Sequence, residues 1–343
     1  MVFLKKRYIS FTLLLLMIVY VVFTVSRNYY LMFLFTLACI NAIAVLGITI
    51  VSGYTGLLHL GQMAFVGIGA YASALISIKL GLSFWIALPF SIFLAAVAGV
   101  LLGIPVLKLR GGPYLALVTI AFGEIVYVIL INWAVLTGGP FGLGGIKSPW
   151  LGPFQITGIR TYLIFCIIFL IISFIIARQI INSRFGNAFI SIRESEEAAQ
   201  SIGINTTKYK IMAFALAAAF GGIAGTLYAP FIGYLSPEQF RYSYSIALIS
   251  MAIVGGLNNL LGAIIGAFVL TFLPELLRIA VEFRLVLYGV LLILTLAFLP
   301  NGLISLWGLS LIETKDLFKK RMEELFGITR KTKTSKQECT LKR

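Results

Sequence analysis

The sequence predicts an all-α, polytopic membrane protein, a bundle of about ten transmembrane helices in which some segments are broken or re-entrant. Three observations predict this class. Hydrophobic residues occupy 60% of the 343 positions, only 11% are charged, and the mean hydropathy is +1.02. Runs of about 20 apolar residues, the length that crosses a bilayer as a helix, recur along the chain. Glycine is abundant, with 33 residues, as is typical of helices that pack closely in lipid.

The apolar runs set the expected order of the elements. The first run follows Lys5, Lys6 and Arg7 and lacks a small-residue cleavage site, so we interpret it as a retained helix rather than a signal peptide. Glycines interrupt the pattern within 53–70 and 242–266, where we expect helix breaks or short re-entrant pieces. The expected spans are 8–25, 30–51, 61–79, 84–107, 113–136, 160–181, 209–231, 242–257, 260–281 and 284–307.

The basic residues indicate how the bundle is oriented. Residues 1–309 form the expected transmembrane domain and residues 310–343 a basic tail. Lys and Arg gather before the first span, in the expected inner loop 182–208 and in the tail, so we expect a multi-pass protein of the plasma (inner) membrane with both termini cytoplasmic. The formal charge of +15 therefore follows the positive-inside rule, and it indicates contact with membrane lipid rather than nucleic acid.

The sequence carries no motif for catalysis. It has no G-x-x-x-x-G-K-[ST] phosphate loop, so we do not expect it to hydrolyse ATP by itself. It has no Ser/His/Asp set either. His59 is the single histidine, which excludes a His-based metal cluster, and Cys39, Cys166 and Cys339 are not spaced as a disulfide framework or metal site. We therefore predict neither an enzyme nor a protein that holds a metal or cofactor.

One short charged stretch interrupts this apolar chain. A helix from about Phe189 to Ile202 would place Phe189, Ile192, Ser195, Ala199 and Ile202 on one face. Gly203 suits the end of that helix, and Asn205 or Thr206 suits the start of the next one. Three glutamates cover the polar face, whereas helices that lie on lipid favour Lys and Arg there. The stretch therefore fits better in a groove on a cytoplasmic protein partner.

At this point the residues resemble a known family. The segment RFGNAFISIRESEEAAQSIGINTTKYKIMAFALAAAFGGIAGTLYAP is similar to the cytoplasmic loop of branched-chain amino-acid ABC transporter permeases, in particular the LivM-type subunit. The resemblance covers most of the chain, because further segments match in the family's order. They are SGYTGLLHLGQMAFVGIGAYASAL, KLRGGPYLALVTIAFGEIV, LTGGPFGLGGI, YLSPEQF, VGGLNNLLGAIIGAFVL and LPELLR followed by RLVLYGVLLILTLAFLPNGL.

This resemblance implies a role and a set of partners. Such permeases pair with a second homologous permease subunit, two cytoplasmic ATP-binding subunits and an extracytoplasmic substrate-binding protein. The resemblance implies an ATP-driven importer that carries branched-chain or related hydrophobic amino acids into the cell. The charged stretch would then be the coupling helix, seated in an ATP-binding subunit. The implied coupling residues are Arg193, Glu194, Glu196, Glu197, Ala199, Ile202 and Gly203.

The polar residues near the glycine-rich break are candidates for the translocation path. Tyr54, Thr55, His59 and Gln62 belong to this break. His59 could line the path or lie at the membrane interface. Glu124 lies about 16 Å into its span, near the middle of the hydrocarbon core, where a carboxyl is costly. It could contact a substrate ammonium group or be a hydrogen-bonded packing residue.

Other transport functions stay open at this stage. The family often has Ser at the position of His59 and Gln at that of Leu57, and it usually lacks Pro113. These departures leave room for a permease of urea, nucleosides or another small solute. A proton-coupled secondary transporter, with Glu124 as the proton carrier, is a further alternative. The acidic docking helix favours the ATP-driven importer, because a self-powered carrier needs no such helix.

Overall fold

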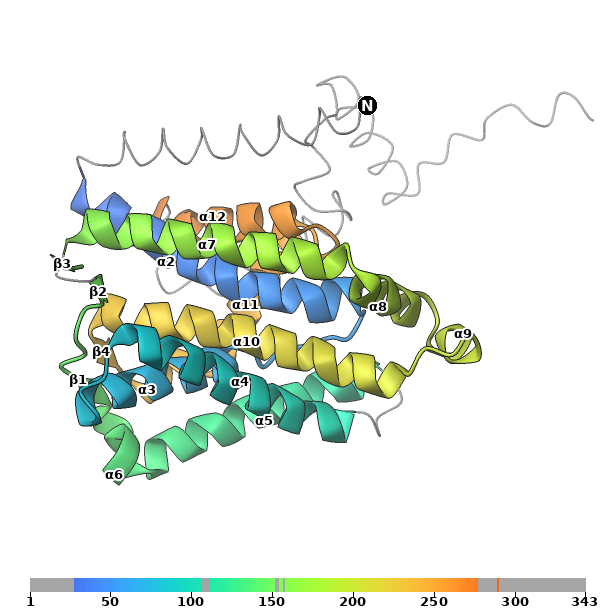
Figure 1. Ribbon diagram of the computed structural model, residues 1–343, viewed down its shortest axis with the longest axis horizontal. Helices are drawn as coiled ribbons and strands as arrows, with labels where there is room; N and C mark the ends of the chain where they lie inside the picture. Colours follow the sequence, from blue (N-terminus) through green and yellow to red (C-terminus); the bar gives the residue numbers. More distant parts are fainter. Residues whose placement is uncertain (1–27, 107–111, 152–153, 157, 277–288, 290–343) are drawn as a thin grey trace, which may run out of the picture.

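The computed structural model describes residues 28–106, 112–151, 154–156, 158–276 and 289 (Figure 1). The predicted spans 8–25 and 284–307 and the basic tail lie outside the described residues. Within the described part the chain is helical, apart from four two-residue strands and the connecting loops. The prediction of a polytopic helical membrane protein is confirmed.

Six helical segments of the described part are long and apolar enough to cross a membrane. Each lies within about one helical turn of a predicted span. The first of them begins where the Asn28 side chain accepts a hydrogen bond from the Tyr30 amide at 3.1 Å, and it ends as a π-helix. The segments are α2 (Tyr29–Ile48) with η1 (Thr49–Tyr54), α3 (Gln62–Lys79), α4 (Phe84–Val106), α5 (Gly112–Asn132), α7 (Ile159–Ile181) and α10 (Thr206–Ile232).

Helix α10 is the central element of the bundle, and α2, α3 and α4 pack directly against it (Figure 1). Small residues bring the backbones together. A Cβ added at Gly69 of α3 would lie 2.7 Å from the Gly222 Cα of α10, and one added at Gly225 would overlap the Val66 carbonyl oxygen. This is the close packing that glycine permits between membrane helices, where lipid supplies no hydrophobic driving force.

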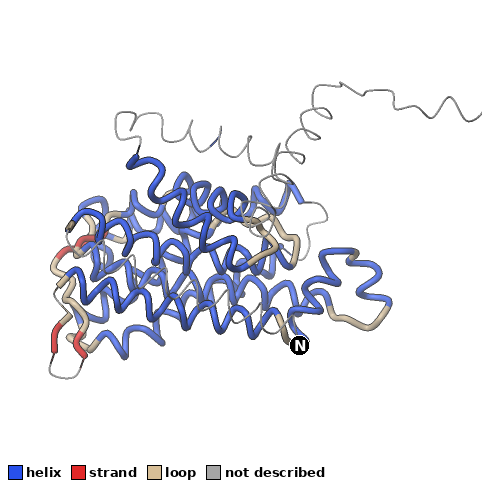
Figure 2. The backbone as a smooth tube through the Cα atoms, turned by 90° about the horizontal axis from the view of Figure 1, so that it is seen from above, coloured by secondary structure: helices blue, strands red, loops and turns tan. Residues whose placement is uncertain are grey.

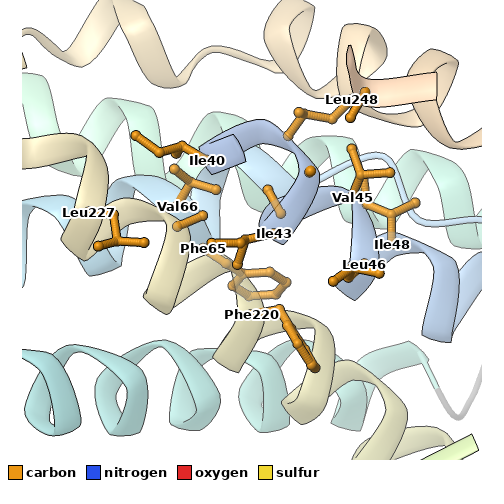
Figure 3. Packing of buried hydrophobic residues seen from close by; sticks show 14 of the residues in the cluster. Ile40, Ile43, Val45, Leu46, Ile48, Phe65, Val66, Phe220, Leu227 and Leu248 are labelled. Carbon is orange, nitrogen blue, oxygen red and sulfur yellow. The ribbon is translucent and has the colours of Figure 1, made fainter. Parts of the chain in front are cut away.

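Apolar side chains fill the remaining space around α10. Figure 3 shows Ile40 and Ile43 of α2 facing Phe65 of α3, with Phe220 and Leu227 contributed by α10. Each of these side chains is at most 3% exposed, so the core is as dry as that of a soluble protein. The non-helical segment between η1 and α3 lies within this packed region, which limits the access of water to it.

The two ends of the bundle differ (Figures 1 and 2). One end, which we call the strand end, holds the short strands and turns between the spans. At the other end two short helices project beyond the bundle. We call this projection the elbow, and it consists of α8 (Arg184–Glu194), Ser195 and α9 (Glu196–Ser201). The strand end holds α6 (Ala134–Thr137), η2 (Gly139–Phe141), η3 (Pro237–Phe240) and the antiparallel pairs β1 (Leu143–Gly144) with β4 (Tyr234–Leu235) and β2 (Trp150–Leu151) with β3 (Phe154–Gln155).

Helix α11 (Tyr242–Gly255) ends two residues before the span predicted there, and helix α12 (Leu260–Leu276) fills the described part of the next predicted span. They contain 14 and 17 residues in the described part, about 21 and 26 Å of helix. The hydrocarbon core is about 30 Å thick. Glycine lets the two backbones touch, since a Cβ added at Gly255 would overlap the Gly262 carbonyl oxygen. This glycine-interrupted pair matches the helix break expected within 242–266.

The contact at Gly225 predicts a large difference between two glycine substitutions. Gly225→Ala forces a methyl group into the Val66 carbonyl, and overpacking of this kind costs about 1–3 kcal/mol. Gly123→Ala is the control, because no heavy atom lies within 4 Å of a Cβ added there. Thermal unfolding of the purified full chain in detergent should show a lower midpoint for the first variant only. Equal midpoints would contradict the packing described.

Candidate functional site

The elbow is built from two helices rather than the single one predicted. α8 starts at Ser183, whose hydroxyl accepts a hydrogen bond from the Phe185 amide at 3.2 Å. The expected continuous helix is wrong, because Ser195 adopts extended backbone angles (φ −161°, ψ 117°). Its hydroxyl accepts from the Ala198 amide at 3.2 Å and so starts α9. Serine is a favoured residue at this N-capping position, and acidic residues such as Glu196 and Glu197 are favoured in the first turn that follows.

The break changes which elbow side chains are exposed. Phe189, Ile192 and Ala199 are buried, as the predicted apolar face requires. Ile202, assigned to the same face, is instead 73% exposed, because the chain turns at Ser195. Apart from Ala199, every residue from Arg193 to Gly203 is exposed, and Glu194, Glu197 and Ile202 are exposed without a hydrogen bond or ion pair to the transmembrane body in the described part of the chain. Gly203 has φ +85° directly after α9, which confirms its role at the helix end.

Glu196 forms an ion pair within the chain, although its side chain stays 44% exposed. Its carboxylate lies 2.6 Å from Lys210 Nζ of α10, and the Lys210 side chain is only 10% exposed. Gln200 of α9 also donates to the Thr206 hydroxyl at 3.0 Å. Asn205 caps α10, as predicted, by accepting from the Lys208 amide at 3.0 Å. These bonds fix α9 to the first turns of the central helix α10.

Arg193 links the elbow to two further segments of the bundle. Its Nη1 donates to the Gly53 carbonyl oxygen at 3.0 Å and to Asn258 Oδ1 at 2.6 Å. Gly53 lies in the last turn of η1, and Asn258 lies in the turn between α11 and α12. The elbow is therefore attached to three separate parts of the transmembrane body: α10, η1 and the α11–α12 turn.

A second feature is the break between η1 and α3. Gln62, the first residue of α3, donates from Nε2 to the Ala44 carbonyl of α2 at 3.2 Å and to the Ala217 carbonyl of α10 at 2.9 Å. Ala44 precedes the end of η1 by ten residues, so α3 starts about 15 Å inside the bundle. The connecting residues 55–61 are therefore non-helical backbone at membrane depth, which is tolerated only where protein or a cavity surrounds it.

Side chains replace the backbone hydrogen bonds that this break removes. The Leu60 amide donates to the Thr119 hydroxyl at 3.0 Å, and the Met63 amide donates to the Ser245 hydroxyl at 2.9 Å. The His59 amide donates to the Ser52 hydroxyl at 3.2 Å. Segments from η1, α5 and α11 thus hold the start of α3 in place.

His59 and Gln62 form a buried pair in this break. Their Nε2 and Oε1 atoms lie 3.1 Å apart. Because the Gln62 amide nitrogen faces two carbonyls, its oxygen must accept, and the proton of His59 is therefore on Nε2. The His59 Nδ1 is buried and has no hydrogen-bond partner in the described part of the chain. The ring centroids of Phe65 and Phe214 each lie 5.5 Å from that of the imidazole.

Four of the five predicted path residues belong to one segment, in which His59 and Gln62 contact each other and Tyr54 and Thr55 lie at the opposite end. Tyr54, Thr55, His59 and Gln62 all lie at the η1–α3 break, where all but half-buried Tyr54 are enclosed. Glu124 lies apart from them on α5 and is half-buried. Its Oε1 is buried and has no hydrogen-bond partner among the described residues.

Sequence reasoning missed a polar cluster at the strand end. The Tyr127 hydroxyl of α5 donates to the Glu238 carboxylate of η3. The Arg241 guanidinium lies 5.2 Å from the Tyr127 ring centroid and 3.5 Å from the same carboxylate. The segment YLSPEQF was noticed as a motif, but a partner 111 positions away cannot be read from it. No group of three or more potential metal ligands occurs within the described residues.

Comparison with known proteins identifies the family. A family model described as the branched-chain amino acid transport system / permease component matches residues 30–296. The chain belongs to this family. It is a LivM-like permease component of a branched-chain amino acid ABC transport system, a transport component rather than an enzyme.

Individual relatives of this permease agree with that assignment. The high-affinity branched-chain amino acid transport system permease protein LivM of Escherichia coli (strain K12) is 35% identical over 295 residues, which cover 79% of this chain and 69% of the relative. The probable LivM of Methanocaldococcus jannaschii is 27% identical over 62% of this chain and 67% of its own length. The LivH permease protein of Escherichia coli (strain K12) is 30% identical over 36% of this chain and 40% of its own length. No solved structure matches the permease.

The three hydrogen bonds of Gln62 predict the effect of removing its amide. Gln62→Leu keeps the side-chain volume but leaves the buried His59 N–H without its acceptor, which costs about 1–3 kcal/mol. The unfolding midpoint of the purified permease should fall measurably. Ser73→Ala on the same helix is the control, because the Ser73 hydroxyl bonds only to the nearby Ala70 carbonyl at 3.0 Å. A Gln62→Leu midpoint equal to that of the control would contradict the role assigned to the amide.

Proposed function

We propose that this permease is one subunit of an ATP-driven importer that moves branched-chain or related hydrophobic amino acids across the plasma membrane into the cell. Family membership supports the substrate class. The observation that carries the mechanism is the elbow, a projection with an acidic exposed surface that is anchored to the bundle on two sides. A rigid projection of this kind can receive force from a separate motor subunit.

The exposed face of the elbow is the proposed seat of an ATP-binding subunit. Ile202 presents an apolar side chain that is 73% exposed, and Glu194 and Glu197 are exposed beside it in sequence. An apolar anchor with charges around it is the usual composition of a protein–protein contact. Ala199 supports this face from inside, and Gly203 ends it. The partner's cleft would carry complementary basic groups.

The remaining partners follow from the same orientation. A second homologous permease would complete the membrane core, in keeping with the partial likeness to a LivH protein. The elbow would face the cytoplasm, as would both termini and the tail 310–343 that follows the transmembrane domain 1–309. The strand end would then face outward, where an extracytoplasmic substrate-binding protein delivers the amino acid. Two ATP-binding subunits would serve the pair of permeases.

The translocation path would run beside the η1–α3 break. Tyr54, Thr55, His59 and Gln62 are the proposed residues here, together with Glu124 on the neighbouring helix α5. Polar groups at membrane depth mark pathways because their burial is otherwise costly. A cofactor has no place in this function, since the partner subunits supply the ATP hydrolysis.

Charge reversal tests the docking surface. Glu194→Lys combined with Glu197→Lys should lower co-purification of the ATP-binding subunits, and with it leucine uptake into proteoliposomes, by at least about tenfold. Glu238→Lys is the matched control, because it reverses an exposed glutamate at the opposite end of the bundle. Its co-purification yield should equal that of the wild type.

Two results would overturn this function. One is full assembly and uptake in the double variant. The other is wild-type uptake that proceeds without ATP and collapses with the proton gradient, which would identify a secondary transporter instead.

A further inference from the structure

Three separate segments meet at Arg193 on the elbow side of the bundle. They are the end of α8, the end of η1 and the turn between α11 and α12. We call this meeting point the Arg193 junction, and it consists of Arg193, Gly53, Gly56, Leu257 and Asn258. The guanidinium is its centre, with Nη1 donating to Gly53 O at 3.0 Å and to Asn258 Oδ1 at 2.6 Å.

The backbone at the junction is shaped to admit the arginine. A Cβ added at Gly53 would overlap the Leu257 carbonyl oxygen, so η1 and the α11–α12 turn touch directly. Gly56 has φ +73°, and a Cβ there would lie 2.9 Å from the Arg193 Cγ. Glycine is therefore required at both positions, at Gly53 for close approach and at Gly56 for its left-handed backbone and for the stem of Arg193.

Electrostatics favour a cation at this point. η1 and α11 both end here, and the carboxyl end of a helix carries partial negative charge on carbonyls that lack an intrahelical partner. Gly53 O is such a carbonyl. Arg193 also lies in the last turn of its own helix, α8. From the end of α8, the single nitrogen Nη1 thus joins the last turn of η1 to the turn between α11 and α12.

Both contacts of Arg193 lead to the same place inside the bundle. Gly53 adjoins Ser52, whose hydroxyl accepts from the His59 amide at 3.2 Å. Asn258 follows α11, whose Ser245 accepts from the Met63 amide at 2.9 Å. The two routes therefore converge on the η1–α3 break and on the first turn of α3.

We infer that Arg193 is a positioning residue that transmits movement of the elbow to the η1–α3 break through η1 and α11, rather than a contact to the ATP-binding subunit. The inference rests on the proposed function and deepens it. Two groups of elbow residues then have different tasks. Glu194, Glu197 and Ile202 bind the ATP-binding subunit. Arg193 transmits the displacement of the elbow to the η1–α3 break. Glu196 passes it to α10 through Lys210.

The test uses the complete transporter, with both permeases, the ATP-binding subunits and the binding protein, reconstituted in proteoliposomes. Three quantities are measured: co-purification of the ATP-binding subunits, ATP hydrolysis, and leucine transported per ATP hydrolysed. Arg193→Ala should leave co-purification unchanged and ATP hydrolysis active, while leucine per ATP falls at least about tenfold, as loss of a charge-assisted hydrogen bond implies. The leucine transported per ATP by Arg193→Lys should lie between the values of Arg193→Ala and the wild type.

The acceptor on the other side provides a second, milder variant. Asn258→Asp keeps the oxygen and should preserve leucine per ATP, whereas Asn258→Leu should lower it in the same direction as Arg193→Ala. Adding Asn258→Leu to Arg193→Ala should lower leucine per ATP little further, because Arg193→Ala already removes the hydrogen bond to Asn258. Lys208→Ala is the control, since it removes an exposed cation from the first turn of α10, outside the junction.

Each alternative predicts a different result in these measurements. Loss of ATP-binding subunits from Arg193→Ala would overturn the inference in favour of a docking contact. Unchanged leucine per ATP in Arg193→Ala, or a loss as large in Asn258→Asp as in Asn258→Leu, would overturn it as well. If the proposed importer function itself is wrong, the result differs, because the wild-type complex then shows no ATP-dependent leucine uptake at all.

Discussion

The constraint on which this structure depends is that backbone polar groups inside a bilayer need partners within the protein. The chain leaves the helical segment α2–η1 at Tyr54 and starts α3 at Gln62, about 15 Å inside the bundle. Every hydrogen bond lost there must be replaced. Three side-chain hydroxyls accept from amides of this segment and of the start of α3, and the Gln62 amide donates to α2 and α10, which ties the segment to most of the bundle.

That dependence makes the break sensitive to movement elsewhere. A continuous helix moves as a rod, whereas a broken one is held by side chains from elements that can shift separately. The elbow is fixed to α10 through Glu196 and to η1 and the α11–α12 turn through Arg193. A displacement of the elbow therefore also displaces η1 and the α11–α12 turn, which belong to the elements that hold the break. This gives a permease without ATPase motifs a physical route by which ATP binding on the proposed partner subunit would act on its core.

Sequence reasoning found what local signals encode. Long apolar runs located the six spans, and Gly203 and Asn205 marked the helix ends at the elbow correctly. The sequence also carries a signal for the break at Ser195, serine followed by two glutamates, but the apolar periodicity continues across it and predicts one helix. The partners of Glu196 and Arg193 could not be predicted, because they lie 14 and 65 or more positions away and meet only once the helices pack.

The central claim is that the elbow and the two helix breaks move as one mechanical unit. Hydrogen–deuterium exchange on the reconstituted transporter, with and without a non-hydrolysable ATP analogue, tests it most directly. The account predicts that exchange changes together in 193–203, in 51–62 and in 256–259. A change confined to 193–203, with the two breaks unaltered, would contradict it.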